Sequence, residues 1–431
     1  MFIGQVRCWL RKQYMMTLNG IPYFLKSGVI TLLLFVPLLV IAVDNESDPV
    51  INSNTILSSE ERSSTYHRVD SVEFEDGLYK FQLESDIGEF EVKSLAVLKK
   101  RLNEIKILSQ AIIQYENKDE EFSDELRSQL SLSSESADDF ITSPFKTARN
   151  LAGQLSNNLD ATLDGEDPFV RDRLNRYSQR EPNDPTVARH KRNAAFQLGL
   201  DMYSSNHKVQ SFLNTVANAR SSGKVSAGVG LSSDFTTSQK QSEMDTKIRY
   251  ILKSKTLSEL NEYNVDLLLK LGINKKLIKT FIEHKVLSPT NKTTIATYLS
   301  GLEKVSRLDS YIEVVLTADD EVVALIFEQL SKMMFRYYKE TEKFSAFYNF
   351  KGQAAVLTES RRIVFFEYAD LLIWSEENEK KYTQAAKHAM TSGYKGWEVV
   401  NLGGLSSLAG KQMEALAFKH QAGFLKSSGI R

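Results

Sequence analysis

The feature that most constrains this chain is an apolar run of fifteen residues near the N-terminus, at residues 29–43. An α-helix needs about 20 apolar residues to cross the hydrocarbon core of a bilayer, whereas this run is shorter and has Pro37 in its middle. Lysine and arginine residues precede the run and acidic residues follow it, so the positive-inside rule sends the C-terminal bulk of the chain across the membrane. These properties predict a secretory signal peptide.

The residues that close the apolar run fit a cleavage site. Ala42 is the small residue that signal peptidases require, and Val40 is acceptable two positions earlier, so we expect cleavage between Ala42 and Val43 and a periplasmic protein. The alternative is an uncleaved N-terminal anchor in the inner membrane, which presents the same domain to the periplasm. Because Met15 and Met16 offer internal starts, the sequence leaves the start codon open as well.

The cysteine and histidine content limits the chemistry of the chain. Cys8 is the single cysteine and lies before the apolar run, so the chain after cleavage has no thiol for disulfides or thiolate metal sites. The six histidines are scattered without an HExxH motif, and we expect no metal site and no cofactor. The formal net charge of -1 gives no general electrostatic basis for binding nucleic acid.

Alternating apolar residues mark the start of the folded part. Residues 43–68 are rich in Ser, Asn, Glu and Asp without apolar periodicity, which predicts a solvated linker. Between residues 79 and 92, apolar and polar side chains alternate on both sides of a turn at 85–88, which predicts a β-hairpin with one apolar face. A helical stripe with Ser94 as its N-cap runs from Leu95 to Ile112, and we expect it to cover that face.

Helical patterns dominate the middle of the chain, where prolines and glycines separate them. We expect helices from Thr186, as the N-cap, to about Gly199, over 206–220, up to Gly272, from Thr290 and over 319–339, with a flexible linker at 221–233. The last ninety residues instead favour strands at 343–350, 354–359, 362–369 and 397–402, and helices at 375–392 and 406–420.

The predicted fold class is therefore α+β and predominantly α-helical. An N-terminal β-hairpin packs on a helix, a central helical body follows, and a small α/β unit ends the chain. The predicted bounds are 1–42 for the signal peptide or anchor, 43–68 for the linker, 69–165 for the hairpin-plus-helix unit, 166–341 for the helical body and 342–431 for the C-terminal unit.

Two segments have the composition to contact anions. A strand followed by Gly403 and Gly404 and by a helix that starts at Ser406 and Ser407 can direct backbone N–H groups at an anion, although a diglycine equally makes a tight strand-to-helix turn. Residues 171–192 carry seven Arg or Lys residues against three acids. This basic segment suits an anionic membrane surface or an acidic partner, and is otherwise a solvated loop.

Five stretches, taken in order, resemble an uncharacterised family of exported proteobacterial proteins. They are YKFQLESDIGEFEVKSLAVLKKRLNEIKIL, SPFKTARNLA, AFQLGLDMYSSNHKVQ, LGINKKLIKTFIEHKVLSPTNKTTIATYLSGLEKV and LLIWSEENEK. The family tends to read Gly-Val-Asp-Pro-Tyr-Ser in the third stretch, whereas here Met202 replaces the proline, which puts the exact turn at Asp201 in doubt. The SPTN turn and the Trp374-Ser375 pair keep their places. The resemblance implies export and a shared fold, and it transfers no catalytic residue, because the family has no established activity.

The sequence thus predicts an exported envelope protein with a binding or scaffolding role and an unidentified protein partner in the cell envelope. No catalytic residue is assigned. Two alternatives stay open: an envelope enzyme with a site at the 403–407 turn, and a peripheral membrane protein that uses the basic segment 171–192 on an anionic surface.

Overall fold

The computed structural model describes residues 45–116, 122, 124–126, 128, 180–225, 242–302, 304–350 and 353–423. The chain divides into two units, residues 1–44 and residues 45–431, and every described residue belongs to the second. The predicted signal peptide, the Ala42–Val43 cleavage site and the boundary at residue 165 therefore lie outside the described residues. Within the described ranges, no helix combines the length and the hydropathy needed to cross a bilayer.

A three-stranded antiparallel sheet opens the described chain, in the order β1 (His67–Glu75), β2 (Leu78–Ser85) and β3 (Gly88–Lys93). The predicted hairpin is β2 and β3, in which Phe81 lies opposite Val92 and Leu83 opposite Phe90. The sequence did not reveal β1, because a register shift between Val69 and Ser71 breaks the alternation of apolar and polar residues in this strand.

The described part of the predicted linker, residues 45–68, contains regular structure. It forms two short helices, α2 (Ser53–Ile56) and α3 (Ser59–Arg62), and Leu57 between them is buried. Two of the polar residues that suggested a linker are helix caps: Asn52 accepts a hydrogen bond from the N–H of Asn54, and Ser58 forms a capping box with Glu61.

Helix α4 (Leu95–Glu116) packs its apolar stripe on the sheet, as predicted, and Ser94 accepts a hydrogen bond from the N–H of Ala96 at its start. Two further helices, α9 (Pro185–Leu198) and α10 (His207–Ser221), share this core, which we call the N-terminal core. The N-cap of α9 is Asp184 rather than Thr186, because its carboxylate accepts hydrogen bonds from the N–H groups of Thr186 and Val187 while Pro185 fills the first helical position.

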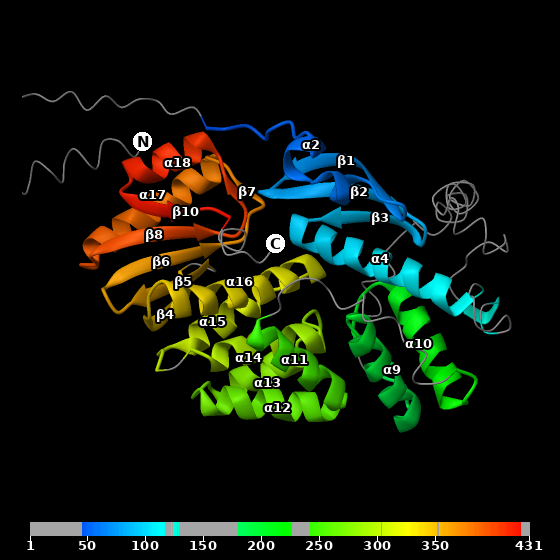
Figure 1. The fold of residues 1–431 in the computed structure, drawn as a ribbon. Helices are drawn as coiled ribbons and strands as arrows, with labels where there is room; N and C mark the ends of the chain where they lie inside the picture. The colour runs from blue at the N-terminus through cyan, green and yellow to red at the C-terminus, as the bar shows by residue number, and fades with distance from the viewer. Residues whose placement is uncertain are drawn as a thin grey trace, which may run out of the picture. The chain divides into compact units, whose positions relative to one another are not determined.

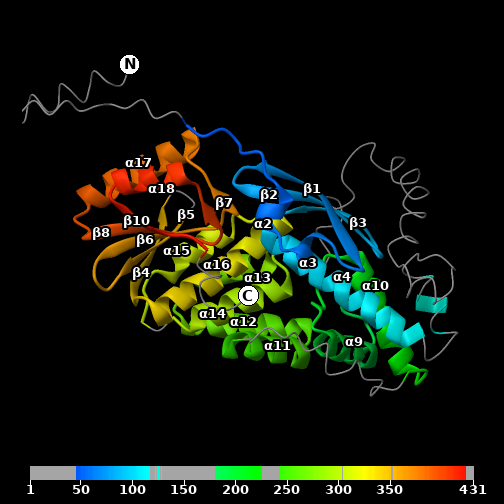
Figure 2. The same ribbon diagram turned by 45° about the horizontal axis from the view of Figure 1, so that its top comes forward.

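The second core, which we call the C-terminal core, lies among helices α12–α16 and the C-terminal sheet. The helices of this part are α11 (Glu243–Ser254), α12 (Leu257–Lys270), α13 (Lys275–Glu283), α14 (Pro289–Ser300), α15 (Leu308–Val315) and α16 (Glu321–Glu340). Helix α14 begins at Pro289, one residue before the predicted start, with Ser288 as its cap. Figure 2 shows α11–α16 between the C-terminal sheet and α9.

The C-terminal sheet has the order β10-β8-β6-β5-β4, with β6, β8 and β10 parallel. Its elements are β4 (Phe344–Phe350), β5 (Gln353–Thr358), β6 (Arg362–Glu367), β7 (Leu371–Leu372), α17 (Glu376–Thr391), β8 (Gly396–Asn401), β9 (Gly404–Leu405), α18 (Ser407–Ala415) and β10 (Phe418–Gln421). Helices α17 and α18 cover one face, and α15 and α16 cover the other (Figure 1). The fold is α+β, as predicted.

The last predicted helix is too long, because the chain returns to the sheet after α18. Helix α18 ends at Ala415, and Ala417 takes a left-handed conformation with φ 61°. Phe418, which is buried, then pairs with Trp397 to start β10. Burial of this aromatic residue at the sheet edge outweighs the local helical pattern.

The Asp370 carboxylate connects the C-terminal unit to the N-terminal sheet. It accepts hydrogen bonds from the backbone N–H groups of Tyr79 (3.0 Å) and Leu95 (2.9 Å), so it lies at the start of β2 and at the N-terminus of α4. A carboxylate is favourable at a helix N-terminus, where N–H groups lack partners within the helix.

We therefore expect Asp370→Ala to lower the free energy of unfolding by about 2–4 kcal/mol, because two backbone donors lose their acceptor. Asp266, which is exposed on α12, provides the control, and Asp266→Ala should change stability by less than about 0.5 kcal/mol. Urea unfolding measures both variants, and equal losses would contradict this role of Asp370.

Candidate functional site

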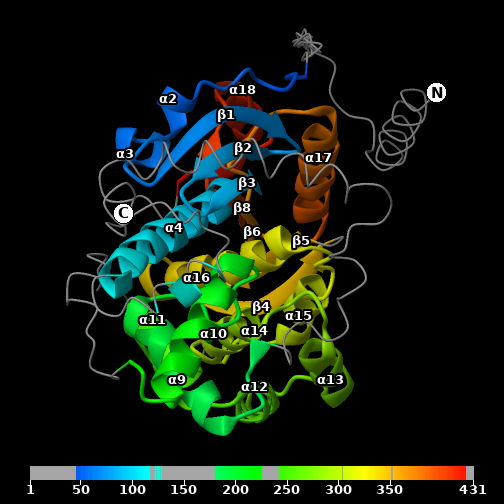
Figure 3. The same cartoon turned by 90° about the vertical axis from the view of Figure 1, so that its right-hand side faces the viewer.

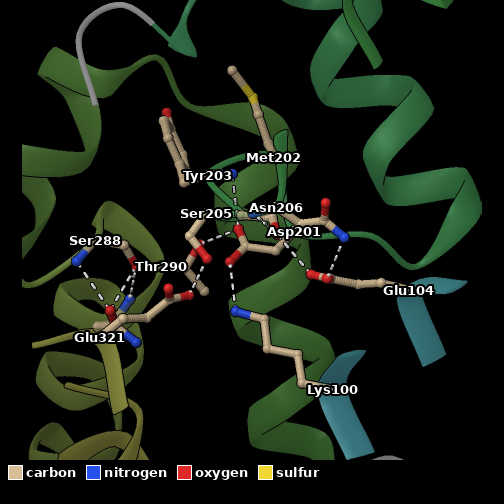
Figure 4. Close-up of polar contacts among 12 residues, drawn as sticks. Lys100, Glu104, Asp201, Met202, Tyr203, Ser205, Asn206, Ser288, Thr290 and Glu321 are labelled. Atoms are coloured by element: carbon tan, nitrogen blue, oxygen red, sulfur yellow. Dashed lines mark hydrogen bonds and ion pairs between the residues drawn. The ribbon is translucent and has the colours of Figure 1, made fainter. Parts of the chain in front are cut away.

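Charged and polar side chains from elements of both cores meet at the turn between α9 and α10 (Figure 4). They come from α4, from this turn, from the first turn of α14 and from the start of α16. We call the group the Asp201 cluster, and its members are Lys100, Arg101, Glu104, Asp201, Ser204, Ser205, Asn206, Thr290 and Glu321.

The turn is built by polar side chains that bond to their own backbone. Gly199, with φ 71°, ends α9 in the left-handed conformation that glycine adopts readily. Asp201 then accepts a hydrogen bond from the N–H of Tyr203 (2.9 Å), and Asn206 caps α10 through the N–H of Lys208 (3.0 Å). The Asp201 turn that the family resemblance left in doubt is thus closed by side chains and has no need of proline.

Glu104 is the most deeply buried charge of the cluster, with 3% of its side chain exposed. Its carboxylate accepts hydrogen bonds from Arg101 (2.6 Å), Ser204 (2.7 Å) and Asn206 (3.2 Å). A buried carboxylate is tolerated only when it is paired and hydrogen-bonded, and all three donors fulfil that condition. Glu104 therefore holds α4 against the α9–α10 turn.

Asp201 and Ser205 extend the cluster to the C-terminal core. Asp201 accepts a hydrogen bond from the Thr290 hydroxyl (2.6 Å) and pairs with Lys100 (3.4 Å), and the Ser205 hydroxyl donates to Glu321. Burial alone would lower the pKa of the Lys100 ammonium, but carboxylates led by Asp201 outweigh it and raise that pKa above its usual value. Lys100 is therefore fully charged at neutral pH.

A second polar chain continues from α14 into α16. Glu328 accepts a hydrogen bond from Asn291 (2.9 Å) and pairs with Lys332 (3.2 Å), which also lies 3.5 Å from Asp245 of α11. Each of these groups bonds to a group on another element or on the next helical turn. The Asp201 cluster and this second chain together connect α4, the α9–α10 turn, α11, α14 and α16. Paired polar groups of this kind can hold the five elements in one orientation, and we call this structural role a joint.

Because Glu104 is buried and multiply bonded, Glu104→Ala should lower the free energy of unfolding by about 3–5 kcal/mol, through the Arg101 charge that it leaves unpaired. The matched control is Glu283→Ala in the exposed Lys279–Glu283 pair (3.9 Å), where the loss should stay below about 1 kcal/mol. Denaturant unfolding measures both variants. A small loss of unfolding free energy in Glu104→Ala would contradict the structural role of Glu104.

The residues predicted to bind an anion at the 403–407 turn are engaged within the protein. The N–H groups of Gly403, Gly404 and Ser406 donate to the carbonyl oxygens of Ala369, Asp370 and Leu372, which pairs β9 with β7. A Cβ atom on Gly403 would lie 2.3 Å from the backbone carbonyl oxygen of Asp370. The close approach of the two backbones therefore explains why glycine stands at position 403. Ser407 opens α18, and the anion-site prediction stays a prediction.

The Ser406 side chain nevertheless bonds to an anion, which the chain itself supplies. Its hydroxyl donates to the Glu46 carboxylate (2.5 Å), and the N–H of Trp374 donates to the same oxygen (2.6 Å). Glu46 also donates its own N–H to the Trp374 carbonyl (2.9 Å). These contacts hold the residues just after the predicted signal peptide on the C-terminal unit.

The described part of the basic segment, residues 180–192, turns much of its charge inward. Lys191 is fully buried and donates to the Arg180 carbonyl (2.6 Å) and to Gln210 (2.9 Å), and Arg192 pairs with Glu181 (2.5 Å). Burial, aided by the Arg180 charge, lowers the pKa of Lys191 to about 7. Arg189 is exposed, whereas residues 171–179 lie outside the described ranges.

A basic and aromatic surface that the sequence did not predict lies on α9 and α11. On the Phe196 ring lie the Arg249 guanidinium (5.0 Å from the ring centroid), the Lys253 ammonium (4.4 Å) and the Tyr250 ring (5.1 Å). Tyr250 is 57% exposed, and Arg249 also donates to the Phe196 carbonyl (2.9 Å). We call Phe196, Arg249, Tyr250 and Lys253 the Phe196 platform.

The described histidines make local contacts. His67, which is buried, hydrogen-bonds to Ser64 (2.8 Å) within one tight turn at the start of β1. In the ranges that the structure describes, no three His, Cys, Asp or Glu side chains are arranged to hold a metal ion.

Asp86, in the β2–β3 turn, is a buried carboxyl group beside the N-terminal core. Both of its oxygens are buried without a hydrogen-bond partner. Burial raises the pKa of Asp86 from 3.8 to about 7. The folded protein therefore binds this proton more tightly than the unfolded chain does.

The resulting stabilisation is complete below about pH 4 and is lost as the pH rises through about 7. Since an asparagine side chain cannot ionise, Asp86→Asn should gain up to about 4 kcal/mol relative to the parent protein between pH 4 and pH 8. Unfolding across this pH range tests it, with the exposed Asp266→Asn as control. A difference that does not change with pH would contradict this account of Asp86.

No protein-family model, curated protein or solved structure matches the chain. The resemblance to an exported proteobacterial family thus stays a prediction from the five stretches of sequence.

Proposed function

We propose that this chain is an exported cell-envelope protein, located in the periplasm, whose role is to bind a partner or to hold an assembly together. The apolar run at 29–43, with basic residues before it and acidic residues after it, supports export. The resemblance to exported proteobacterial proteins supports the same location.

The Phe196 platform is the observation that carries the binding role. Tyrosine and arginine are enriched where proteins bind partners, because both combine a large contact area with directed polar groups. Tyr250 keeps 57% of its surface in solvent and packs against the Phe196 ring, on which Arg249 and Lys253 also lie. An aromatic side chain held in this way is preorganised for contact and loses little conformational freedom on binding.

The Asp201 cluster supports a scaffolding role in the same protein. Its carboxylates bond to charged and hydroxyl groups that connect α4, the α9–α10 turn, α14 and α16, rather than converging on a common point. A body held in one orientation in this way can present a surface without reorganising when it binds.

One experiment tests export and binding in the same cells. A photoreactive phenylalanine analogue replaces Tyr250, or Met390 as control, in a C-terminally tagged protein expressed in a Gram-negative host. Met390 is 61% exposed on α17, so the two positions are matched in exposure. After irradiation, the tagged protein is purified from the periplasmic and membrane fractions, and its mass and N-terminus are read.

We expect a discrete covalent adduct from position 250 and none from position 390, on a chain that begins at Val43. A chain that keeps its N-terminus in the membrane fraction would instead identify the apolar run as an anchor, with the binding role unchanged. A chain that stays in the cytoplasm would contradict export. The absence of any adduct from position 250 would contradict the binding role.

A further inference from the structure

We propose that the Phe196 platform, together with Arg189 and Lys247, binds the headgroup layer of an anionic phospholipid bilayer. Helices α9 and α11 lie side by side (Figures 2 and 3), so their exposed faces form one surface. Arg189 and Phe196 are seven residues apart on α9, and Lys247 and Tyr250 are three apart on α11, which places each pair on one helical face. The bilayer is thus the partner in the proposed binding function, on which this proposal rests.

This surface has a positive charge although the whole chain is nearly neutral. Arg189, Lys247, Arg249 and Lys253 supply four cations, and the only acids within α9 and α11 are Glu243 and Asp245. Asp245 is turned towards other helices: it accepts a hydrogen bond from Tyr298 of α14 (2.8 Å) and pairs with Lys332 of α16 (3.5 Å). Four cations against these two acids leave the surface positive.

Within the described part of the basic segment, residues 180–192, two of the cations do not reach this surface. Lys191 and Arg192 point inward and bond to Arg180 and Glu181. Among the cations of that segment that lie on α9, Arg189 is exposed. The described part of the basic segment thus supplies Arg189 to the proposed surface, and the other cations, Lys247, Arg249 and Lys253, come from α11.

The aromatic residues favour a membrane over an acidic protein. Tyrosine flanked by lysine and arginine is typical of helices that lie in the headgroup layer, where the ring contacts the acyl boundary and the cations contact phosphate. The Lys253 ammonium lies over the Phe196 ring, so its charge can remain at the phosphate level while its aliphatic stem is buried.

The expected strength is that of a reversible contact. Each basic residue near an anionic surface increases binding about fivefold, so four residues increase it roughly several hundredfold at low salt. Binding of this kind falls steeply with ionic strength, because salt screens the attraction.

The test measures co-sedimentation of the purified full chain with vesicles. One vesicle preparation contains phosphatidylglycerol and phosphatidylethanolamine, the other only phosphatidylcholine, and each is used at low and at high NaCl. The test variant is Lys247→Glu with Lys253→Glu. The matched control is Lys275→Glu with Lys276→Glu, which makes the same charge change on the exposed face of α13. A third variant, Tyr250→Ser, removes the exposed ring without changing charge.

We expect salt-sensitive binding to the phosphatidylglycerol vesicles, at least about tenfold weaker binding by the test variant and less than about a twofold change in the control. Tyr250→Ser should weaken binding severalfold and leave its salt dependence unchanged. Equal binding to both kinds of vesicle, or equal losses in test and control variants, would overturn the proposal.

The same variants separate this proposal from the binding function on which it rests. If vesicles are not bound but polyglutamate is bound by the parent protein and lost in the test variant, the surface recognises an acidic protein and the lipid proposal is wrong. A photoreactive adduct at position 250 would then still support the binding function. If neither vesicle binding nor any adduct is found, both proposals fail.

Discussion

The burial of the Glu104 carboxylate is the constraint on which the arrangement of the described chain depends. With 3% of its side chain exposed, this charge is stable only while Arg101, Ser204 and Asn206 all bond to it. Two of these partners lie in the α9–α10 turn, so the charge fixes that turn on α4. In the same turn, Asp201 bonds to Thr290 and Ser205 bonds to Glu321. These two bonds fix the turn against α14 and α16 of the C-terminal core.

Sequence patterns predicted the elements whose periodicity is regular. The β2–β3 hairpin, α4 and the strands β5, β6 and β8 follow a regular apolar pattern. Strand β4 was predicted as well, although its register shifts between Phe344 and Ala346. The sequence-based predictions were wrong where a register shift, helix capping or burial outweighed the local pattern. A register shift hid β1, two of the polar residues before it cap short helices, and burial of Phe418 makes the end of the last predicted helix the strand β10.

The candidate site could not be predicted from sequence in the same way. Lys100, Asp201 and Glu321 are distant in the chain, and only the fold brings them together. One local signal existed: Arg101 and Glu104 are three residues apart on α4, which is the spacing of an ion pair within a helix. At the 403–407 turn the sequence identified the geometry of a strand-to-helix turn, whereas the partners of its N–H groups came from β7 and the residues before it.

Native-state hydrogen exchange tests most directly whether the Asp201 cluster joins the two cores into one cooperative unit. Amide exchange is followed in α4 and β2 of the N-terminal core and in α14 and α16 of the C-terminal core as urea is raised. We predict that the slowest amides of both cores exchange through one common opening, with the same free energy and the same urea dependence. Two distinct opening free energies in the parent protein would show that the cores unfold independently and would contradict the role of the Asp201 cluster as their joint.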